Sequence, residues 1–220
     1  MRGFIVIEGL IGVGKTSLCR SLETEFGARL VLEPAETNPF LELFYGDPRR
    51  YALPVQLTYL LQRWRQQDRI RQGDLFGPLV VSDYCFAKDR LFAEKTLDDD
   101  EVTIYDQVAR SLGAKAPTPD LLVYLEAPLP IVMKRIAHRD APGERAITAT
   151  YLEDLAARYE TLLERWTACP ILRIDNRGLD ILVDGSARNE VFRRIALALG
   201  GEVASRVTGD DPQASLFPMR

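Results

Sequence analysis

The amino-acid sequence predicts one α/β domain with a five-stranded parallel sheet flanked by helices. Short apolar runs alternate along the chain with longer stretches in which apolar residues recur every three or four positions. The runs are apolar throughout, as expected of parallel strands covered by helices on both faces. The 220 residues contain no internal repeat and no linker-like segment, so we expect a single domain.

Five runs are predicted as strands because each is short, apolar and bounded by glycine, proline or polar residues. They are residues 3–8, 29–32, 78–82, 121–125 and 170–174. Helices are expected at residues 18–26, 51–71, 86–95, 101–112, 128–138, 151–166 and 189–199, with one more that starts at 38–40. Gly27 is the expected C-terminal cap of the first helix, and Pro39 the first residue of the second.

The longest predicted helix carries an apolar stripe that should face the core. The stripe consists of Leu53, Leu57, Leu60, Leu61 and Trp64. Trp166 is likewise expected in the core or at an interface. His138 has no acidic or cysteine partner at motif spacing, and we expect it at the surface.

Composition excludes several classes of protein. Hydrophobic residues make up 46% and charged residues 27% of the chain, which excludes a disordered, fibrous or disulfide-dense protein. The apolar runs are strand-sized, far short of the roughly 18 to 20 residues of a membrane span. The 28 basic and 32 acidic residues give a net charge of −4, so no direct nucleic-acid contact is indicated.

Cysteine usage and the first residues indicate a cytoplasmic location. Cys19, Cys85 and Cys169 are odd in number and widely separated, which argues against a disulfide framework or a zinc site. A predicted strand begins almost at once, without the pattern of a signal peptide. We therefore expect a protein of a reducing compartment.

The first predicted strand leads into a glycine-rich loop and then a helix. This segment matches the pattern G-x-x-x-x-G-K-[ST] in the strand–loop–helix context that the pattern requires. Backbone N–H groups of such a loop surround a phosphate, its lysine reaches the β- and γ-phosphates, and its threonine ligates Mg²⁺. We therefore expect a nucleoside triphosphate to bind here. The predicted ATP-binding residues of the loop are Gly9, Leu10, Ile11, Gly12, Val13, Gly14, Lys15 and Thr16.

Three further features narrow the class of nucleotide-binding protein. An N-K-x-D sequence for guanine recognition is missing, which argues against a GTPase. The third predicted strand leads to a single carboxylate, Asp83, placed to hold the metal, whereas ATPase motors carry an acidic pair. Glu33, followed by Pro34, lies at the end of the second strand, at the edge of the sheet where α/β folds bind ligands.

The order and spacing of these motifs resemble the deoxynucleoside kinases, most of all the bacterial deoxyadenosine/deoxyguanosine kinases. The resemblance extends from Phe4 to about Ile195. The segments that carry it are residues 7–16, Glu33-Pro34, 38–41 with Phe44-Tyr45, Gln56 with Arg63, Asp83-Tyr84 with Lys88 and Phe92-Ala93, Arg135-Ile136, and 151–153. It implies a P-loop kinase fold over residues 1–199, with a short lid at about 139–147.

The resemblance implies an ATP- and Mg²⁺-dependent kinase that phosphorylates the 5′-hydroxyl of a purine 2′-deoxynucleoside as a homodimer. Glu33 would be the general base, and a carboxylate that only caps a turn is the alternative. Lys15, Arg135 and Arg139 would stabilise the transferring phosphoryl group.

The metal and the ATP base have their own predicted residues. Thr16 and Asp83 would position Mg²⁺, and Asp83 at a helix N-cap is a compatible alternative. Asp175 follows the fifth strand, in the region where the family's adenine-contacting loop lies.

The deoxynucleoside site is also implied by the resemblance. Tyr45 and Glu144 would bind the 3′-hydroxyl, and Gln56 would form two hydrogen bonds to the base edge. Arg63 and Asp89 would flank a base that bears an amino group and disfavour thymine, so a purine is expected first and deoxycytidine second. An exposed helix glutamine and a solvated arginine are the alternatives for Gln56 and Arg63.

Aromatic side chains are predicted to form a flat pocket for the base, with packing in the core as the alternative. They are Phe40, Phe44, Tyr45 and Phe86.

The sequence departs from the family at two places. The lid often reads Arg-Gly-Arg in the family, but residues 139–141 are Arg-Asp-Ala, and Arg145 is the candidate substitute for the second arginine. Residues 83–85 are Asp-Tyr-Cys where many members have acid-Arg-Ser. Lys88, one helical turn further on, is the candidate for that arginine's charge.

Two other functions compete with this prediction. A nucleoside monophosphate kinase would need additional basic residues for the acceptor phosphate, which the spacing of Gln56 and Arg63 does not indicate. A non-catalytic relative would have no reason to retain Lys15, Thr16 and Glu33 together with Asp83.

The sequence from Gly200 to the end is polar and aperiodic, so residues 200–220 are expected to form a flexible tail. Residues Gln213 to Phe217 read Gln-Ala-Ser-Leu-Phe and resemble the Q-x-x-L-F peptides that bind the sliding clamp of bacterial replication. The alternative is that Leu216 and Phe217 fold back onto the domain.

A chain that ends at Asp211 tests the clamp hypothesis. We expect it to lose binding to the sliding clamp, measured by surface plasmon resonance, because the apolar Leu216-Phe217 pair is gone. Equal binding of the truncated and full-length chains would contradict the hypothesis.

Overall fold

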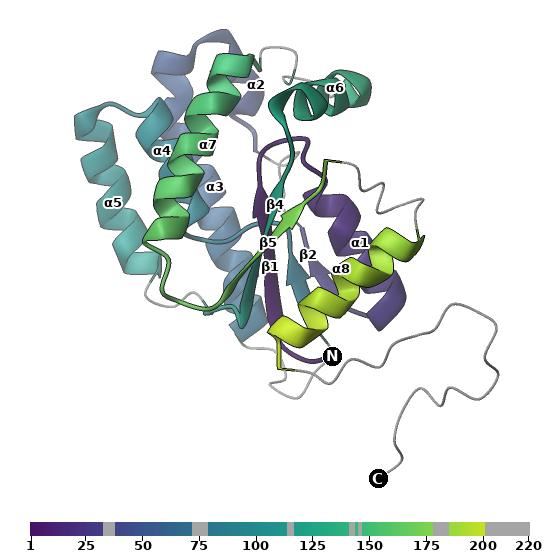
Figure 1. The fold of residues 1–220 in the computed structure, drawn as a ribbon. Coiled ribbons are helices and arrows are strands. Elements are labelled where there is room, and N and C mark those ends of the chain that lie inside the picture. Colours follow the sequence, from purple (N-terminus) through teal and green to yellow (C-terminus); the bar gives the residue numbers. More distant parts are fainter. Residues whose placement is uncertain are drawn as a thin grey trace, which may run out of the picture.

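Strand β1 (Phe4–Gly9) lies in the middle of a five-stranded parallel sheet (Figure 1). The other strands are β2 (Arg29–Val31), β3 (Val80–Ser82), β4 (Leu121–Glu126) and β5 (Ile171–Asp175). Their order across the sheet is β2-β3-β1-β4-β5. The computed structural model describes residues 1–32, 38–71, 79–113, 117–140, 144, 147–177 and 185–200. The predicted five-stranded parallel sheet is confirmed.

Helices cover both faces of the sheet (Figure 1). Helices α1 (Lys15–Phe26) and α8 (Gly185–Ala198) lie on one face. On the other lie α3 (Pro48–Arg71), α4 (Lys88–Thr96), α5 (Asp99–Gly113) and α7 (Ala149–Glu164). Helices α2 (Leu41–Gly46) and α6 (Leu129–Arg139) lie near the carboxyl ends of the strands.

The register between β1 and β3 brings two functional segments together. Val6 pairs with Ser82 in parallel strands, so both chains leave the sheet at neighbouring points of the same edge. The glycine-rich loop follows β1, and Asp83 follows β3. Their proximity therefore depends on the sheet, since 67 residues separate Thr16 from Asp83.

The second helix begins two residues later than predicted. Asn38 accepts a hydrogen bond at Oδ1 from the Phe40 N–H (3.1 Å) and donates from Nδ2 to the Val55 carbonyl (3.1 Å). This side chain holds a turn before the helix, as asparagine often does. Pro39 therefore lies in the turn, and α2 begins at Leu41.

Helix α3 buries the predicted apolar stripe only in part. Leu60 is buried, Leu53 and Leu57 are partly buried against the same cluster, and Leu61 is 40% exposed. The buried face also contains two polar residues, Gln56 and Arg63. Polar side chains can occupy the buried face because they have partners across it. The Gln56 Nε2 donates to Thr96 Oγ1 (3.1 Å), and Arg63 forms an ion pair with Asp89, both partners in α4. Apolar periodicity therefore identified the apolar part of this face and missed its polar part.

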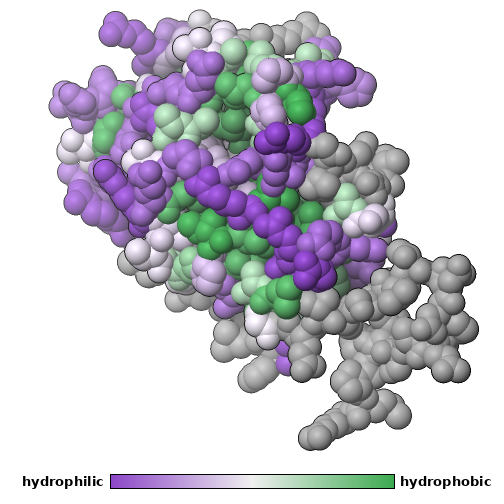
Figure 2. All heavy atoms as spheres, viewed as in Figure 1, coloured by the Kyte–Doolittle hydropathy of each residue, from purple (hydrophilic) through white to green (hydrophobic). Residues whose placement is uncertain are grey.

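The edge strand β5 is covered by charged side chains. Arg173 forms ion pairs with Glu126 and Glu160, from β4 and α7. Figure 2 shows hydrophilic atoms crossing an apolar area between α7 and α8, on the side where β5 runs. Charge on an edge strand disfavours pairing with another sheet. Within the described residues, no helix is both long and apolar enough to span a membrane.

Two glycines in the left-handed region show different constraints. Gly27 caps α1 as predicted, with φ of 63°, and its N–H donates to the Glu23 carbonyl (2.9 Å). A Cβ atom at Gly27 would meet nothing within 4 Å. Gly9 has φ of 141°, and a Cβ atom there would lie 2.5 Å from the Leu125 carbonyl oxygen. Gly9 is therefore constrained both by its backbone angle and by strand β4.

These two positions form a matched test of the loop's first glycine. We expect Gly9→Ala to lower the free energy of unfolding by about 3 kcal/mol or more, from strain and overlap with β4. Gly27→Ala should cost about 1 kcal/mol from backbone strain alone. Urea denaturation followed by circular dichroism measures both, and equal losses would contradict the role assigned to β4.

Candidate functional site

The glycine-rich loop turns from β1 into the first turn of α1. Its backbone has positive φ at Gly9, Gly12 and Gly14, and Gly14 is the N-cap of α1. Side chains are excluded at close range, because a Cβ atom on Gly12 would lie 2.6 Å from Ile136 in α6. The loop therefore presents backbone rather than side chains at a helix N-terminus, an arrangement that binds phosphate.

The ammonium group of Lys15 lies within this loop. Its Nζ donates to the carbonyl oxygens of Gly9 (2.9 Å) and Leu10 (3.0 Å). Burial, followed by the charge of Lys88, lowers the pKa of Lys15 to about 8, and Glu8 and Asp83 act in the opposite direction. Lys15 is therefore held against the loop, and its charge is favoured by Glu8 and Asp83 and disfavoured by burial and Lys88.

Thr16 and Asp83 meet beside the loop. The Thr16 hydroxyl donates to Oδ2 of Asp83 at 2.7 Å. The described residues contain no cluster of three His, Cys, Asp or Glu side chains able to hold a metal alone. Mg²⁺ commonly uses one or two protein oxygens together with phosphates and water. A hydroxyl beside one carboxylate fits this mode of binding.

A buried ion pair joins α3 and α4. The side chains of Arg63 and Asp89 are 4% and 3% exposed, so Arg63 does not belong to a solvated face. The guanidinium carbon lies 5.0 Å from the ring centre of Tyr59 and 5.6 Å from that of Tyr84. A planar guanidinium next to a carboxylate, held by two rings, offers directional donors and acceptors.

Gln56 and Gln66 extend this polar site along α3. Gln56 is buried, so it is not the exposed helix glutamine considered as an alternative. The Tyr84 hydroxyl donates to Oε1 of Gln66 (2.6 Å), and Nε2 of Gln66 donates to the Leu32 carbonyl (3.1 Å). A chain of hydrogen bonds thus connects the segment after β3 with the end of β2.

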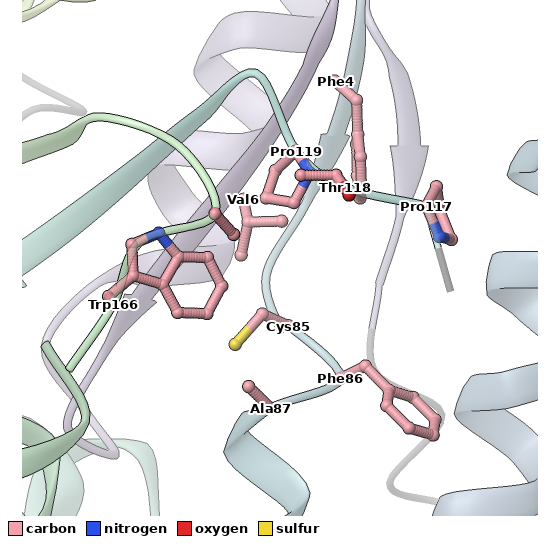
Figure 3. A pocket seen from close by; sticks show the side chains of 10 residues that line it. Phe4, Val6, Cys85, Phe86, Ala87, Pro117, Thr118, Pro119 and Trp166 are labelled. Carbon is pink, nitrogen blue, oxygen red and sulfur yellow. The ribbon is translucent and has the colours of Figure 1, made fainter. Parts of the chain in front are cut away.

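Three of the predicted aromatic residues have side chains that the structure describes, namely Phe40, Phe44 and Phe86. Phe44 and Phe86 pack against the apolar cluster of α3, α4 and α5 that includes Leu60. Phe86 also lines an apolar pocket of about 170 Å³ with Val6, Trp166 and other residues (Figure 3). Phe40 is half-buried at the start of α2. Phe44 and Phe86 therefore pack in the core at least in part, and their contact with a base stays a prediction.

The two arginines of α6 make different contacts. Arg135 donates to the carbonyl oxygens of Val13 (3.1 Å) and Asn176 (2.9 Å). Arg139 pairs with Glu144, with 2.9 Å from Nε to Oε2. A predicted catalytic arginine and a predicted sugar-binding carboxylate are thus joined in one ion pair. His138, on the same helix, is exposed as predicted.

The residues at the end of β5 differ in their surroundings. Asp175 is exposed, and its carboxylate pairs with Arg177 (2.7 Å from Nε). The next residue, Asn176, is 3% exposed and donates from Nδ2 to the Val13 carbonyl at 2.5 Å. Sequence reasoning missed Asn176, because a single polar residue after a strand is a weak signal.

A buried carboxylate that sequence reasoning also missed lies at the end of β1. Glu8 is 1% exposed and accepts hydrogen bonds from the Cys85 N–H (2.6 Å) and the Tyr159 hydroxyl (2.9 Å). Burial lowers the pKa of nearby Lys88, and the charges of Glu8 and Asp83 oppose this. The available signal was a lone acidic residue in an otherwise apolar strand.

Comparisons with known proteins identify the family. The model of the deoxynucleoside kinase family matches residues 5–199. The chain belongs to the deoxynucleoside kinase family. It is 32% identical to the deoxyguanosine kinase of Bacillus subtilis, over 88% of this chain and 94% of the relative. It is 29% identical to the deoxyadenosine/deoxycytidine kinase of the same organism, over 87% and 91%.

Solved structures of the family share the fold of this kinase. The deoxyadenosine kinase from M. mycoides with bound dATP superposes with a TM-score of 0.75. The two chains are 21% identical, and the match covers 87% of this chain and 98% of that one. The predicted P-loop kinase fold is thereby confirmed.

Some predicted site residues of this kinase lie outside the described residues. They are Glu33, Arg145 and the side chain of Tyr45, together with Gln213 to Phe217 of the tail. Among the described residues, the loop, Thr16, Asp83 and Lys88 lie together at the carboxyl ends of β1 and β3.

Removing one hydroxyl tests the importance of the buried Glu8. We expect Tyr159→Phe to lower the free energy of unfolding by about 1.5–3 kcal/mol, because the carboxylate loses a buried partner. Tyr124→Phe is the matched control, since the Tyr124 ring packs at 5.5 Å from that of Tyr159. Urea denaturation should show a clearly smaller loss for Tyr124→Phe, and the reverse order would refute the assignment.

Proposed function

We propose that this kinase phosphorylates the 5′-hydroxyl of a purine 2′-deoxynucleoside, deoxyadenosine or deoxyguanosine, with ATP as donor, in nucleoside salvage. The observation that carries the proposal is the buried ion pair of Arg63 and Asp89 between α3 and α4. A guanidinium and a carboxylate side by side can pair with a base edge that offers both acceptors and donors. A base with an amino group meets this requirement better than thymine.

Relatives support a purine, with deoxycytidine as the second candidate. The names of two Bacillus subtilis relatives include deoxyguanosine, deoxyadenosine and deoxycytidine. Cytosine also carries an amino group and a ring acceptor, so the same pair suits it. Deoxycytidine ranks second because a purine deoxynucleoside is named in both of these relatives and deoxycytidine in only one.

The phosphate end of the proposed reaction is assigned to the loop. Backbone N–H groups and Lys15 would bind the phosphates of ATP, and Arg139 of α6 would stabilise the transferring phosphoryl group. Thr16 and Asp83 would hold Mg²⁺, which neutralises negative charge on the phosphates when bound. The 2.7 Å contact between these two side chains supports that assignment.

The acceptor end is assigned to Glu33 as general base. Residue 33 directly follows Leu32, whose carbonyl is held by Gln66 (3.1 Å). Gln66 in turn accepts from Tyr84, whose ring packs against Arg63. These contacts connect the residue before Glu33 to the Arg63 site, which supports a general base near the nucleoside, since proton transfer requires close contact. Association as a homodimer and a cytoplasmic location stay predictions.

A substrate screen tests the proposal. The four deoxynucleosides, their ribonucleoside counterparts and the four deoxynucleoside monophosphates are incubated with Mg·ATP, and ADP release is measured. We expect turnover on deoxyadenosine or deoxyguanosine, with a loss of about 10²-fold or more in Glu33→Gln, because the base is removed. Glu42→Gln, at an exposed position of α2, is the matched control and should retain activity.

Other outcomes of the screen point to other functions. Turnover on deoxycytidine alone would replace the purine assignment. Turnover on monophosphates only would make the protein a nucleotide kinase. Full activity of Glu33→Gln would remove Glu33 from the mechanism.

A further inference from the structure

Two side chains from different elements converge on one carbonyl of the phosphate loop. The Val13 oxygen accepts a hydrogen bond from Asn176 Nδ2 at 2.5 Å and another from Arg135 Nη1 at 3.1 Å. Arg135 also donates from Nη2 to the Asn176 carbonyl at 2.9 Å. The Val13 carbonyl, the asparagine and the arginine therefore form a closed set of contacts, which we call the Val13 clamp.

The two donors of the Val13 clamp belong to segments next to the sheet and not to the loop. The Asn176 N–H donates to the Glu126 carbonyl at 2.6 Å, which continues the pairing of β4 with β5 by one residue. Arg135 lies in α6, which follows β4. Both donors are thus carried by regular structure that does not depend on the loop's own conformation.

Holding this carbonyl also orients the next N–H group. In a trans peptide the C=O and the following N–H point in opposite directions, and the described residues contain no cis peptide. With the Val13 carbonyl directed at Asn176 and Arg135, the Gly14 N–H must point away from them. Gly14 is the N-cap of α1, and backbone N–H groups there are the donors that bind phosphate.

We propose that Asn176 is a positioning residue of the phosphate loop, which together with Arg135 fixes the Val13–Gly14 peptide so that the Gly14 N–H donates to a nucleotide phosphate. The inference rests on the proposed function in one respect, that a nucleotide binds to this loop. It assigns to Asn176 a role in binding ATP and none in binding the nucleoside.

Two features show why the loop needs such a restraint. Glycines permit several backbone conformations, and the clamped peptide lies between Gly12 and Gly14, both with positive φ. A Cβ atom on Gly14 would lie 2.9 Å from Asn176 Nδ2, so the asparagine packs directly against the loop. External hydrogen bonds therefore select one orientation from those that the glycines allow.

The asparagine also carries an unfavourable feature that stability alone does not explain. Its Oδ1 atom is buried without a hydrogen-bond partner among the described residues. A buried acceptor without a partner lowers stability. An amide at this position is therefore better explained by the donor that it supplies to Val13 than by packing.

A role in positioning the loop should change the affinity for the nucleotide but not for the nucleoside, whereas a general structural role should change both. In Asn176→Ala we expect the Kd of ADP, measured by titration calorimetry, and the KM for ATP to rise about 10-fold, roughly the contribution of one hydrogen bond. The deoxynucleoside KM should change less than about 2-fold. Arg193→Ala, which removes an exposed side chain of α8 that pairs with Glu190, is the control and should leave both affinities unchanged.

A spectroscopic signal reports on the peptide itself. In wild-type protein the Gly14 amide proton should shift downfield when ADP binds, as it donates to phosphate, and the shift should be smaller in Asn176→Ala. Arg135→Ala should act on the same carbonyl, so the double variant should lose less ADP affinity than the two single losses combined. If Asn176→Ala does not fold, Asn176→Ser and Arg135→Lys provide the same comparison.

Each result decides the matter. Three results for Asn176→Ala would contradict the proposed role of Asn176. They are an unchanged ADP affinity, a Gly14 shift equal to that of the wild type, and a rise in the nucleoside KM equal to the rise in the KM for ATP. Wild-type protein that binds ADP but phosphorylates no deoxynucleoside would refute the proposed function while leaving the clamp testable by ADP binding. Wild-type protein that binds no ADP would overturn both.

Discussion

The buried carboxylate of Glu8 is the constraint on which the arrangement of the site depends. Its two oxygens accept hydrogen bonds from Cys85, in the segment after β3, and from Tyr159 in α7. A carboxylate removed from water is strongly unfavourable without such partners. Strand β1, the segment after β3 and α7 must therefore meet in one way, which also sets the positions of Asp83 and Lys88 on either side of Cys85.

Buried charges at the carboxyl ends of β1 and β3 also need partners of opposite charge. Lys88 is buried and Lys15 half-buried; burial lowers the pKa of both side chains, and the charge of Lys88 lowers that of Lys15 further. Glu8 and Asp83 oppose that effect at both lysines. Fixed charges and dipoles arranged in advance need no reorganisation when a phosphoryl group is transferred. The family to which the chain belongs carries out that chemistry, so burial here serves function as well as packing.

Polar side chains account for the places where prediction and structure differ. The apolar pattern of α3 identified the buried Leu60 but also included the exposed Leu61, and it did not show that the helix buries Gln56 and Arg63, whose partners lie in α4. Helix α2 begins later than predicted because the Asn38 side chain stabilises a turn before it. Sequence periodicity detects only apolar residues that are buried. A buried polar face is recognised only in the folded structure, where each polar side chain contacts its partner.

The sequence by itself determined the parallel α/β sheet, the phosphate loop and the family, because strand composition and the spacing of glycine, lysine and threonine are local properties of the chain. Only the tertiary structure decided which distant residues serve the loop. Asn176 reaches Val13 from 163 positions away, and Tyr159 reaches Glu8 from 151. Such contacts arise from strand order and register, which bring together segments whose separate sequences carry no sign of one another.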